Sequence, residues 1–254
     1  MTFAVLRVQK LKGTGKIRVA AAHNRRTIQA EIGASCHIDP ARISLNVALY
    51  GAHSPEAIAA NAEAKMQAAG ITKLRKDAVR AIEVIISLPA GHTIKDTQFF
   101  DDAACWLAAC FGGMGNLLSA DIHRDEAAPH CHVLLLPLIG GRMVGSDALG
   151  GKTKLRKLQT DFYEQVALAY GLQRPKPKLH GTAKNQAAQA VLQRLQQLAD
   201  PTMQGAVWQV VRDCIKRDPS DFMQALGLAH TPTKKLRSLA ATFTSKGKGS
   251  QSEA

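Results

Sequence analysis

Several features of other protein classes are missing from this chain of 254 residues. No uninterrupted apolar run approaches the roughly 18 residues that a membrane span needs, and the first residues are too weakly apolar for a secretory signal. The five cysteines are odd in number and scattered, without the spacing of a zinc finger or a disulfide framework. We therefore expect a cytoplasmic protein with reduced thiols and no membrane span.

Motifs of common enzyme classes are absent as well. The sequence contains no GxxxxGK[ST] loop, so ATP hydrolysis has no support, and it lacks the helical HExxH pattern of a metallopeptidase. There are only three tyrosines, Tyr50, Tyr163 and Tyr170, which limits the candidates for a tyrosine nucleophile. Tyr163 and Tyr170 lie seven residues apart in a predicted helix, which favours a packing role for both.

Positive charge is in excess, with 33 Lys and Arg against 20 Asp and Glu and a net charge of +13. Such an excess favours an anionic partner, most commonly nucleic acid. The charge is uneven: residues 1–50 hold eight basic and two acidic residues, residues 101–150 two and six, and residues 151–254 seventeen and seven. An acidic centre between basic flanks suggests a cation held centrally and phosphates held at the sides.

Hydrophobic periodicity and helix-capping signals predict the elements of the fold. Helices are expected at 17–32, 54–69, 97–111 and 152–170, and strands at 3–9, 78–88, 117–123 and 130–138, the last two forming a hairpin. The fold class is therefore α+β, with a mainly antiparallel central sheet flanked by helices. We expect a catalytic domain over residues 1–180, a small helical appendage over 181–230, and a basic, disordered tail over 231–254.

The most informative stretch is HRDEAAPHCH, residues 123–132. His130 and His132 are two apart on a strand, so both imidazoles leave the same face, and His123 ends the preceding strand of the hairpin. Three imidazoles on two neighbouring strands form a facial metal-binding set, beside which Asp125 and Glu126 offer oxygen atoms. Cys131 should face the opposite side, in the core. The ligand set by itself leaves hydrolase, oxygenase and nuclease open, and the basic flanks favour a phosphodiester substrate.

These residues resemble a known family. HRDEAAPHCH fits the HxDExxPHxH pattern of the MobV-type (Mob/Pre) plasmid mobilisation relaxases, which belong to the HUH endonuclease superfamily. Residues 23–26 (HNRR) are similar to the family's first motif, HNxR, and residues 39–46, ending in Asn46, to its second. Residues 75–79 also resemble a family segment, as do residues 155–161 together with 170–172. The resemblance covers about residues 1–185 and leaves the last 70 residues unmatched.

The resemblance implies a metal-dependent enzyme that nicks one DNA strand at a plasmid origin of transfer, stays attached to the 5′-phosphate, and later rejoins the strand. In this type of relaxase the histidine of HNxR, here His23, is the proposed nucleophile, and it would form a phosphohistidine intermediate. Tyr50 is the alternative nucleophile, although the family's aromatic residue directly follows the Asn, where this chain has Val47. Glu126 and Arg25 are the other expected catalytic residues.

The remaining expectations concern partners. The resemblance implies single-stranded and hairpin DNA at the origin of transfer, a divalent metal that is Mn²⁺ or Mg²⁺, a bacterial plasmid-encoded source and, as a further partner, a coupling protein of a conjugation apparatus. The residues expected to contact DNA are Arg26, Arg42, Asn46, Arg75 and Lys76, of which Arg26 is expected as a basic surface residue.

Two other functions remain open at this stage. A rolling-circle replication initiator of the same superfamily would share the metal site, and an origin of transfer just upstream of the gene would argue against it. A DNA-binding repressor with a structural metal would not cleave DNA, so metal-stimulated nicking with protein left on the 5′ end would exclude it.

Overall fold

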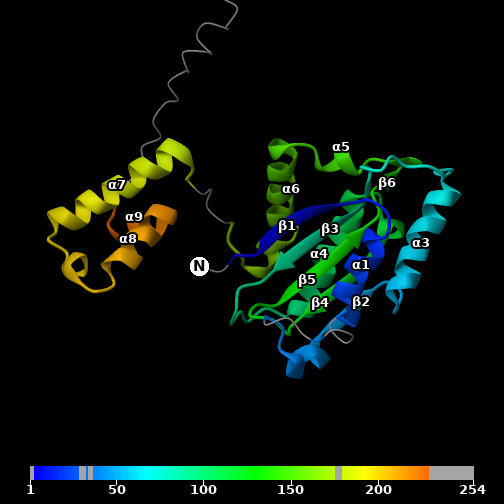
Figure 1. Cartoon of the computed structure of the whole chain (residues 1–254), viewed down its shortest axis with the longest axis horizontal. Helices are drawn as coiled ribbons and strands as arrows, with labels where there is room; N and C mark the ends of the chain where they lie inside the picture. The colour runs from blue at the N-terminus through cyan, green and yellow to red at the C-terminus, as the bar shows by residue number, and fades with distance from the viewer. Residues whose placement is uncertain (1–2, 29–32, 34–36, 175–178, 229–254) are drawn as a thin grey trace, which may run out of the picture. The chain divides into compact units, whose positions relative to one another are not determined.

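A computed structural model describes residues 3–28, 33, 37–174 and 179–228 (Figure 1). The chain divides into two compact units, residues 1–175 and residues 176–254. Each unit has its own apolar core within its described residues. In the described part of the chain, no helix is both long and apolar enough to cross a membrane.

The first unit is built on a five-stranded sheet with the strand order β1-β3-β5-β4-β2. These strands are β1 (Val5–Lys12), β2 (Val47–Tyr50), β3 (Val79–Ser87), β4 (Leu117–His123) and β5 (His130–Leu135). Every neighbouring pair is antiparallel. The predicted α+β fold with an antiparallel sheet is therefore confirmed. The hairpin strands β4 and β5 lie inside the sheet, so their backbone groups are bonded on both sides.

Helices cover both faces of this sheet (Figure 1). On one face α1 (Lys16–Asn24) and α3 (Pro55–Ala68) pack through Ile17 and Ile58 against Leu134 of β5. On the other face α4 (Asp96–Cys110) and α6 (Lys152–Gln165) pack through Phe99 and Phe162 in a core that includes Cys131. Since side chains alternate along a strand, His130 and His132 face α1, while Cys131 faces α4, as predicted.

Short elements complete the first unit. Its 3-10 helices are η1 (Pro40–Leu45), η2 (Met114–Asn116) and η3 (Ala167–Tyr170), and a small hairpin, β6 (Leu138–Ile139) with β7 (Arg142–Met143), precedes the short helix α5 (Gly145–Leu149). In the second unit, α7 (Gly181–Gln197), η4 (Pro201–Gln204), α8 (Trp208–Arg217) and α9 (Ser220–Ala225) enclose a core around Val191 and Ile215. These helices fall within residues 181–230, where a helical appendage was expected, whereas the tail at 231–254 lies outside the described residues.

The elements differ from the predictions in two places. The helix expected over 17–32 is interrupted: α1 ends at Asn24, the backbone turns at Arg26, whose φ is 60°, and helical residues resume at Thr27 and Ile28. Residues 29–32 lie outside the described residues. The short edge strand β2 was not foreseen, since its four residues carry too little periodicity to stand out.

Candidate metal centre and active site

The three predicted histidines come together on the α1 face of the sheet. His123 and His130 are direct partners in the β4–β5 ladder, and His132 lies two residues along the same strand. The ring of His123 lies 5.1 Å from that of His130 and 4.7 Å from that of His132, centroid to centroid. One nitrogen from each ring lies within 4.8 Å of the others, and all three side chains are buried. The predicted geometry of the triad is therefore present.

Each histidine is fixed by a hydrogen bond from its other ring nitrogen. Nε2 of His123 donates to the carbonyl of Asn24 at 2.7 Å, and Nδ1 of His130 donates to the carbonyl of Ala128 at 2.9 Å. Nδ1 of His132 donates to Oε1 of Glu83 at 2.9 Å. These bonds leave one unprotonated nitrogen on each ring, which is the usual arrangement of metal-ligating histidines.

The donor set fits a divalent metal ion. Nδ1 of His123 is buried and has no hydrogen-bond partner among the described residues, although a buried polar atom of this kind normally has one. Burial, reinforced by the charge of His132, lowers the pKa of His123 to about 2, so the ring is neutral and its lone pair is available. Three imidazoles that leave coordination positions open match a site that also accepts a phosphate oxygen.

Glu83 of β3 was not singled out from the sequence. Its carboxylate accepts a hydrogen bond from His132 and another from Nδ2 of Asn24, at 3.1 Å. Burial by itself would raise the pKa of Glu83, but the hydrogen bond and the charge of His132 outweigh it and lower the pKa. The sequence did contain a signal for this residue. Glu83 is the single carboxylate in the otherwise apolar run AIEVII, and a glutamate in a buried strand rarely lacks a partner.

His23 lies in the last turn of α1, beside the triad. Its ring centroid is 5.7 Å from that of His132 and 6.4 Å from that of His123. Burial, then the charges of His132 and Arg26, lower its pKa, so the imidazole is neutral near pH 7. The structure therefore brings the predicted nucleophile to the predicted metal site.

Arg26 is buried, which corrects its expected place on the basic surface. Its side chain is 4% exposed, its Nε and Nη2 atoms donate to both carboxylate oxygens of Asp125 at 2.8 and 2.7 Å, and Nη2 also donates to Glu126 at 2.8 Å. The two carboxylates, which lie in the loop between β4 and β5, thus neutralise the charge of Arg26. Oε1 of Glu126 lies 3.8 Å from Nε2 of His130, so it borders the metal centre.

Asn46 and Arg42 also form hydrogen bonds with the loop between β4 and β5. Nδ2 of Asn46 donates to Asp125 at 2.7 Å, and its Oδ1 accepts from the backbone N–H of Arg124 at 2.7 Å. Arg42 is exposed, and its Nη1 donates to the carbonyl of Glu126 at 3.3 Å. The two expected DNA-contacting residues therefore border the metal centre, and Asn46 has a structural role in addition.

Comparison with known proteins identifies this arrangement. The family model Mob_Pre, described as a plasmid recombination enzyme, matches residues 1–191. The chain belongs to this family. It is 29% identical over 195 residues to plasmid recombination enzyme type 3 of Staphylococcus aureus, covering 73% of this chain and 46% of the relative. A plasmid recombination enzyme of Bacillus sp. is 30% identical over 184 residues, 68% of this chain and 42% of the relative. The chain thus spans less than half the length of these relatives.

Solved structures of the Mob_Pre family share the fold. A MobM relaxase domain (MOBV; Mob_Pre), Mn-bound and in complex with pMV158 oriT DNA at pH 6.8, superposes with a TM-score of 0.60 at 25% identity. The match covers 73% of this chain and 98% of that domain. A second Mn-bound complex, at pH 4.6, gives a TM-score of 0.59 at 26% identity, covering 71% of this chain and 96% of that domain. The match to a MOBV relaxase domain confirms the recognised family and supports a divalent metal at the histidines.

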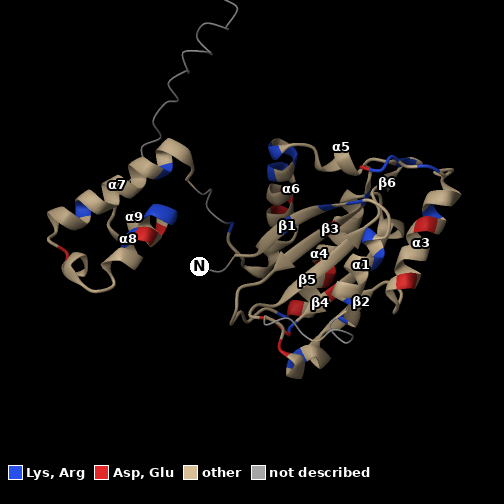
Figure 2. Cartoon of the chain, in the orientation of Figure 1, with Lys and Arg blue, Asp and Glu red and all other residues tan. Residues whose placement is uncertain are grey.

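Two residues expected to grip DNA lie elsewhere in this Mob_Pre chain. Arg75 and Lys76 are exposed and precede the first residue of β3, whereas His130 pairs with Ser87 at its last residue. Eight residues along a strand correspond to roughly 26 Å. Figure 2 shows this basic segment between α3 and β3, at the end of the sheet far from the β4–β5 loop. Arg75 is therefore too far away to contact a phosphate bound at the metal centre.

Tyr50, the alternative nucleophile, faces the other side of the sheet. Its hydroxyl donates to Oδ1 of Asp101 on α4 at 2.7 Å and lies 3.6 Å from Sγ of Cys105. The hydrogen bonds to these two side chains raise the pKa of Tyr50 far above its usual value. The triad lies on the α1 face, so Tyr50 is separated from it by the sheet.

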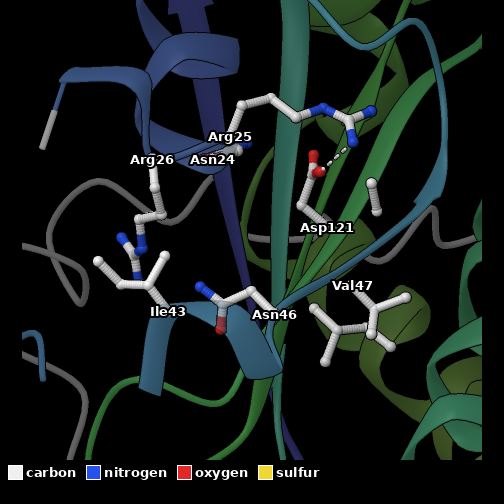
Figure 3. A pocket seen from close by; sticks show the side chains of 9 residues that line it. Asn24, Arg25, Arg26, Ile43, Asn46, Val47 and Asp121 are labelled. Atoms are coloured by element: carbon white, nitrogen blue, oxygen red, sulfur yellow. Dashed lines mark ion pairs between the residues drawn. The ribbon is translucent and has the colours of Figure 1, made fainter. Parts of the chain in front are cut away.

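Arg25 lies beside the metal centre in a pocket of about 190 Å³ (Figure 3). Its Nη1 forms a buried ion pair with Oδ1 of Asp121 at 3.0 Å, and its Nη2 donates to the carbonyl of Tyr50 at 2.7 Å. Burial raises the pKa of Asp121 to about 6, although Arg25 acts in the opposite direction. The expected catalytic arginine is therefore held between β2 and β4 by Asp121, whose direct partner in the β4–β5 ladder is His132.

Proposed function

We propose that this chain nicks one DNA strand at a plasmid origin of transfer and rejoins it, with His23 as the nucleophile. The observation that carries the proposal is the position of His23, whose neutral ring lies 5.7 Å from that of His132 in the three-histidine cluster. The DNA-bound MobM relaxase domains support the nature of the substrate.

The covalent step follows from the chemistry of the residues. A ring nitrogen of His23 attacks phosphorus, an N–P bond forms, and the P–O3′ bond breaks. The proton on the other ring nitrogen is lost and one is gained by the departing 3′-oxygen, so the products are a phosphohistidine and a 3′-hydroxyl. Attack by a 3′-hydroxyl reverses these changes, and this reversal rejoins the strand without another energy source.

Neighbouring residues have distinct parts in this scheme. The three histidines would hold Mn²⁺ or Mg²⁺, which when bound would offset the charge that develops on the scissile phosphate. Glu126 borders His130 and acts electrostatically on His23, which suits it to carry the proton. Arg26 holds Glu126 and Asp125 in place. Arg42, exposed on the loop, can contact the DNA backbone.

The proposal extends to partners and setting. Single-stranded and hairpin DNA at the origin of transfer would be the substrate, and a coupling protein of a conjugation apparatus would be a further partner. The chain would act in the cytoplasm of a bacterium that carries the plasmid.

The first prediction concerns His23. With Mn²⁺ and a supercoiled plasmid carrying the origin, we expect the full chain to nick DNA and remain on the 5′ end, with the attachment mapped to His23 by mass spectrometry. His23→Ala should slow nicking by about a thousandfold or more while still binding Mn²⁺ in calorimetry. Tyr50→Phe is the matched control and should nick like the parent chain. Undiminished nicking by His23→Ala would show that another residue attacks the phosphate.

A further inference from the structure

Arg124 connects three segments of the chain at the end of the sheet that carries the histidines. It directly follows His123 in the loop between β4 and β5, and its side chain is 21% exposed. Its Nε and Nη2 atoms donate to the two carboxylate oxygens of Asp96, both at 2.8 Å, and Nη2 also donates to Oγ1 of Thr97 at 2.8 Å. Its Nη1 donates to the carbonyl of Leu45 at 2.8 Å. The guanidinium therefore ties this loop to the start of α4 and to the end of η1.

The 3-10 helix η1 depends on such polar contacts, because none of its residues is buried. The backbone N–H of Asp39, its N-cap, donates to the carbonyl of Asp125 at 2.7 Å. Asn46, its C-cap, accepts from the backbone N–H of Arg124 at 2.7 Å. Hydrogen bonds to the loop between β4 and β5 thus hold η1 at both ends, and Arg124 adds the link to α4.

The position of η1 matters for the metal centre but is separate from the ligand set. Arg42 of η1 is exposed and donates to the carbonyl of Glu126, whose Oε1 atom lies 3.8 Å from Nε2 of His130. The hydrogen bonds that fix the three histidines go to Asn24, Ala128 and Glu83. A shift of η1 would therefore move Arg42 while leaving the ligands in place.

We propose that Arg124 is a positioning residue, which fixes η1 so that Arg42 meets the DNA backbone beside the metal centre. The inference rests on the proposed function, because it assumes that the strand passes η1 on its way to the histidines. The HxDExxPHxH pattern leaves the position of Arg124 unspecified, so the resemblance to the family assigns it no part.

Arg124 is suited to this part and not to a direct contact with DNA. Each nitrogen of its guanidinium already has an acceptor, so a phosphate could be bound only if these hydrogen bonds broke. The planar fork of an arginine can bind a carboxylate through two atoms and still donate elsewhere, whereas a lysine offers a single ammonium group. The shape of the side chain, and not its charge alone, should therefore be needed.

Three variants separate these effects. Arg124→Gln removes the fork and the charge, and Arg124→Lys keeps the charge without the fork. Asp96→Asn weakens the link from the α4 side and leaves Arg124 in place. Asp161→Asn is the matched control, because it weakens another hydrogen bond of α4, that from Nε1 of Trp106 at 2.9 Å, which has no contact with η1.

Nicking of an oligonucleotide carrying the origin would be measured with the Mn²⁺-loaded full chain. We expect Arg124→Gln to raise KM about tenfold and to change kcat by less than about threefold. Arg124→Lys should recover only part of this loss. Asp96→Asn should raise KM in the same direction, and the double variant should lose less than the sum of the two, since both remove one contact. Asp161→Asn should keep the KM of the parent chain.

Two measurements do not depend on cleavage. In amide hydrogen exchange without DNA or metal, residues 39–46 should exchange faster in Arg124→Gln, whereas β4 and β5 should exchange as in the parent chain. In calorimetry, Arg124→Gln should bind Mn²⁺ with unchanged affinity, because its histidines keep their hydrogen bonds.

The outcomes separate the two proposals. If Arg124→Gln leaves both the exchange of residues 39–46 and KM unchanged, Arg124 does not position η1. A lower kcat at unchanged KM, or full recovery by Arg124→Lys, would also overturn the inference, because Arg124 would then act on the chemical step or through its charge. If the parent chain nicks no DNA, the proposed function itself fails, while hydrogen exchange still tests the hold on η1.

Discussion

Arg26 joins two parts of the site, the end of α1 and the loop between β4 and β5, although the sequence suggested a basic surface residue that contacts DNA. Its φ of 60° ends α1 just after His23, and its guanidinium binds Asp125 and Glu126 in the loop between β4 and β5. A left-handed backbone is unfavourable for an arginine, so these contacts must compensate for it. The HNxR pattern predicted that an arginine matters at this position. Its burial could not be predicted, because it depends on a loop about a hundred residues later in the sequence.

The burial of Arg26 makes a prediction about stability. Arg26→Met would leave Asp125 charged, buried and deprived of its arginine, so we expect a loss of about 3–5 kcal/mol in the free energy of unfolding. Urea denaturation followed by circular dichroism would measure it. Arg75→Met is the matched control, because the ion pair of Arg75 with Asp77 is exposed and should contribute little. Equal effects of the two substitutions would contradict the assigned role of Arg26.

A second ion pair predicts a dependence on pH. Arg124 donates two hydrogen bonds of 2.8 Å to Asp96, and these lower the pKa of Asp96 below its usual value of 3.8. The ionised form of Asp96 is therefore favoured in the folded state. The ion pair contributes to the free energy of unfolding above about pH 4, and this contribution is lost as the pH falls further. The parent chain should be about 1–2 kcal/mol more stable than Asp96→Asn at pH 6, and this difference should shrink by pH 3 in urea titrations. A difference that does not change with pH would count against this ion pair.

At the scale of elements, the sequence predicted those parts that depend on local pattern. The β4–β5 hairpin was foreseen because HRDEAAPHCH places its histidines at strand spacing around a short loop, and the register of His123 with His130 confirms it. The neighbours of the hairpin were not foreseen, since pairing with β2 and β3 is set by contacts distant in sequence. For that reason Glu83 of β3, which bonds to His132, was not recognised. Asp121 lies on the predicted strand itself, two residues before His123, so strand alternation could have placed it on the same face.

Gly51 allows β2 to pass close to β4. Its φ is 89°, and a Cβ atom there would lie 2.3 Å from the carbonyl oxygen of Leu118. Gly51→Ala should therefore combine backbone strain with a clash, and we expect it to lose about 2–4 kcal/mol of unfolding free energy. Gly70→Ala is a suitable comparison, because its φ of 75° is similar but nothing lies within 4 Å of its Cβ position. Chemical denaturation should show a clearly smaller loss for Gly70→Ala; equal losses would mean that the close approach of β2 to β4 is not tight.

At the scale of the whole molecule, the charge pattern suggested a nucleic-acid partner and a centrally held cation. The acidic stretch 101–150 supplies carboxylates to both faces of the sheet, and these are largely engaged by other side chains. Asp125 pairs with Arg26 and Asp121 with Arg25, whereas Asp101 accepts from Tyr50 on the face opposite the histidines. The candidate metal site is defined by imidazoles, whose contribution a count of charges cannot reveal. The basic flanks remain consistent with DNA binding.

The separate cores of the two units predict how a metal ion acts on stability. The histidines belong to the first unit, so Mn²⁺ at about a hundred times its dissociation constant should stabilise that unit by about 2.7 kcal/mol. Differential scanning calorimetry should show two transitions, with only that of the first unit raised, by about 5–10 °C. His130→Ala/His132→Ala should remove the shift. A single transition that moves as a whole would mean that the two units unfold together.

The placement of the histidines on β4 and β5 has a consequence for the lifetime of the site. Both strands are interior to the sheet, with β3 and β2 outside them, so their amides exchange with solvent only when much of the first unit opens. The candidate metal ligands therefore lie in a part of the sheet that opens less readily than its edges, so local fluctuations of β1 and β2 would leave their arrangement intact.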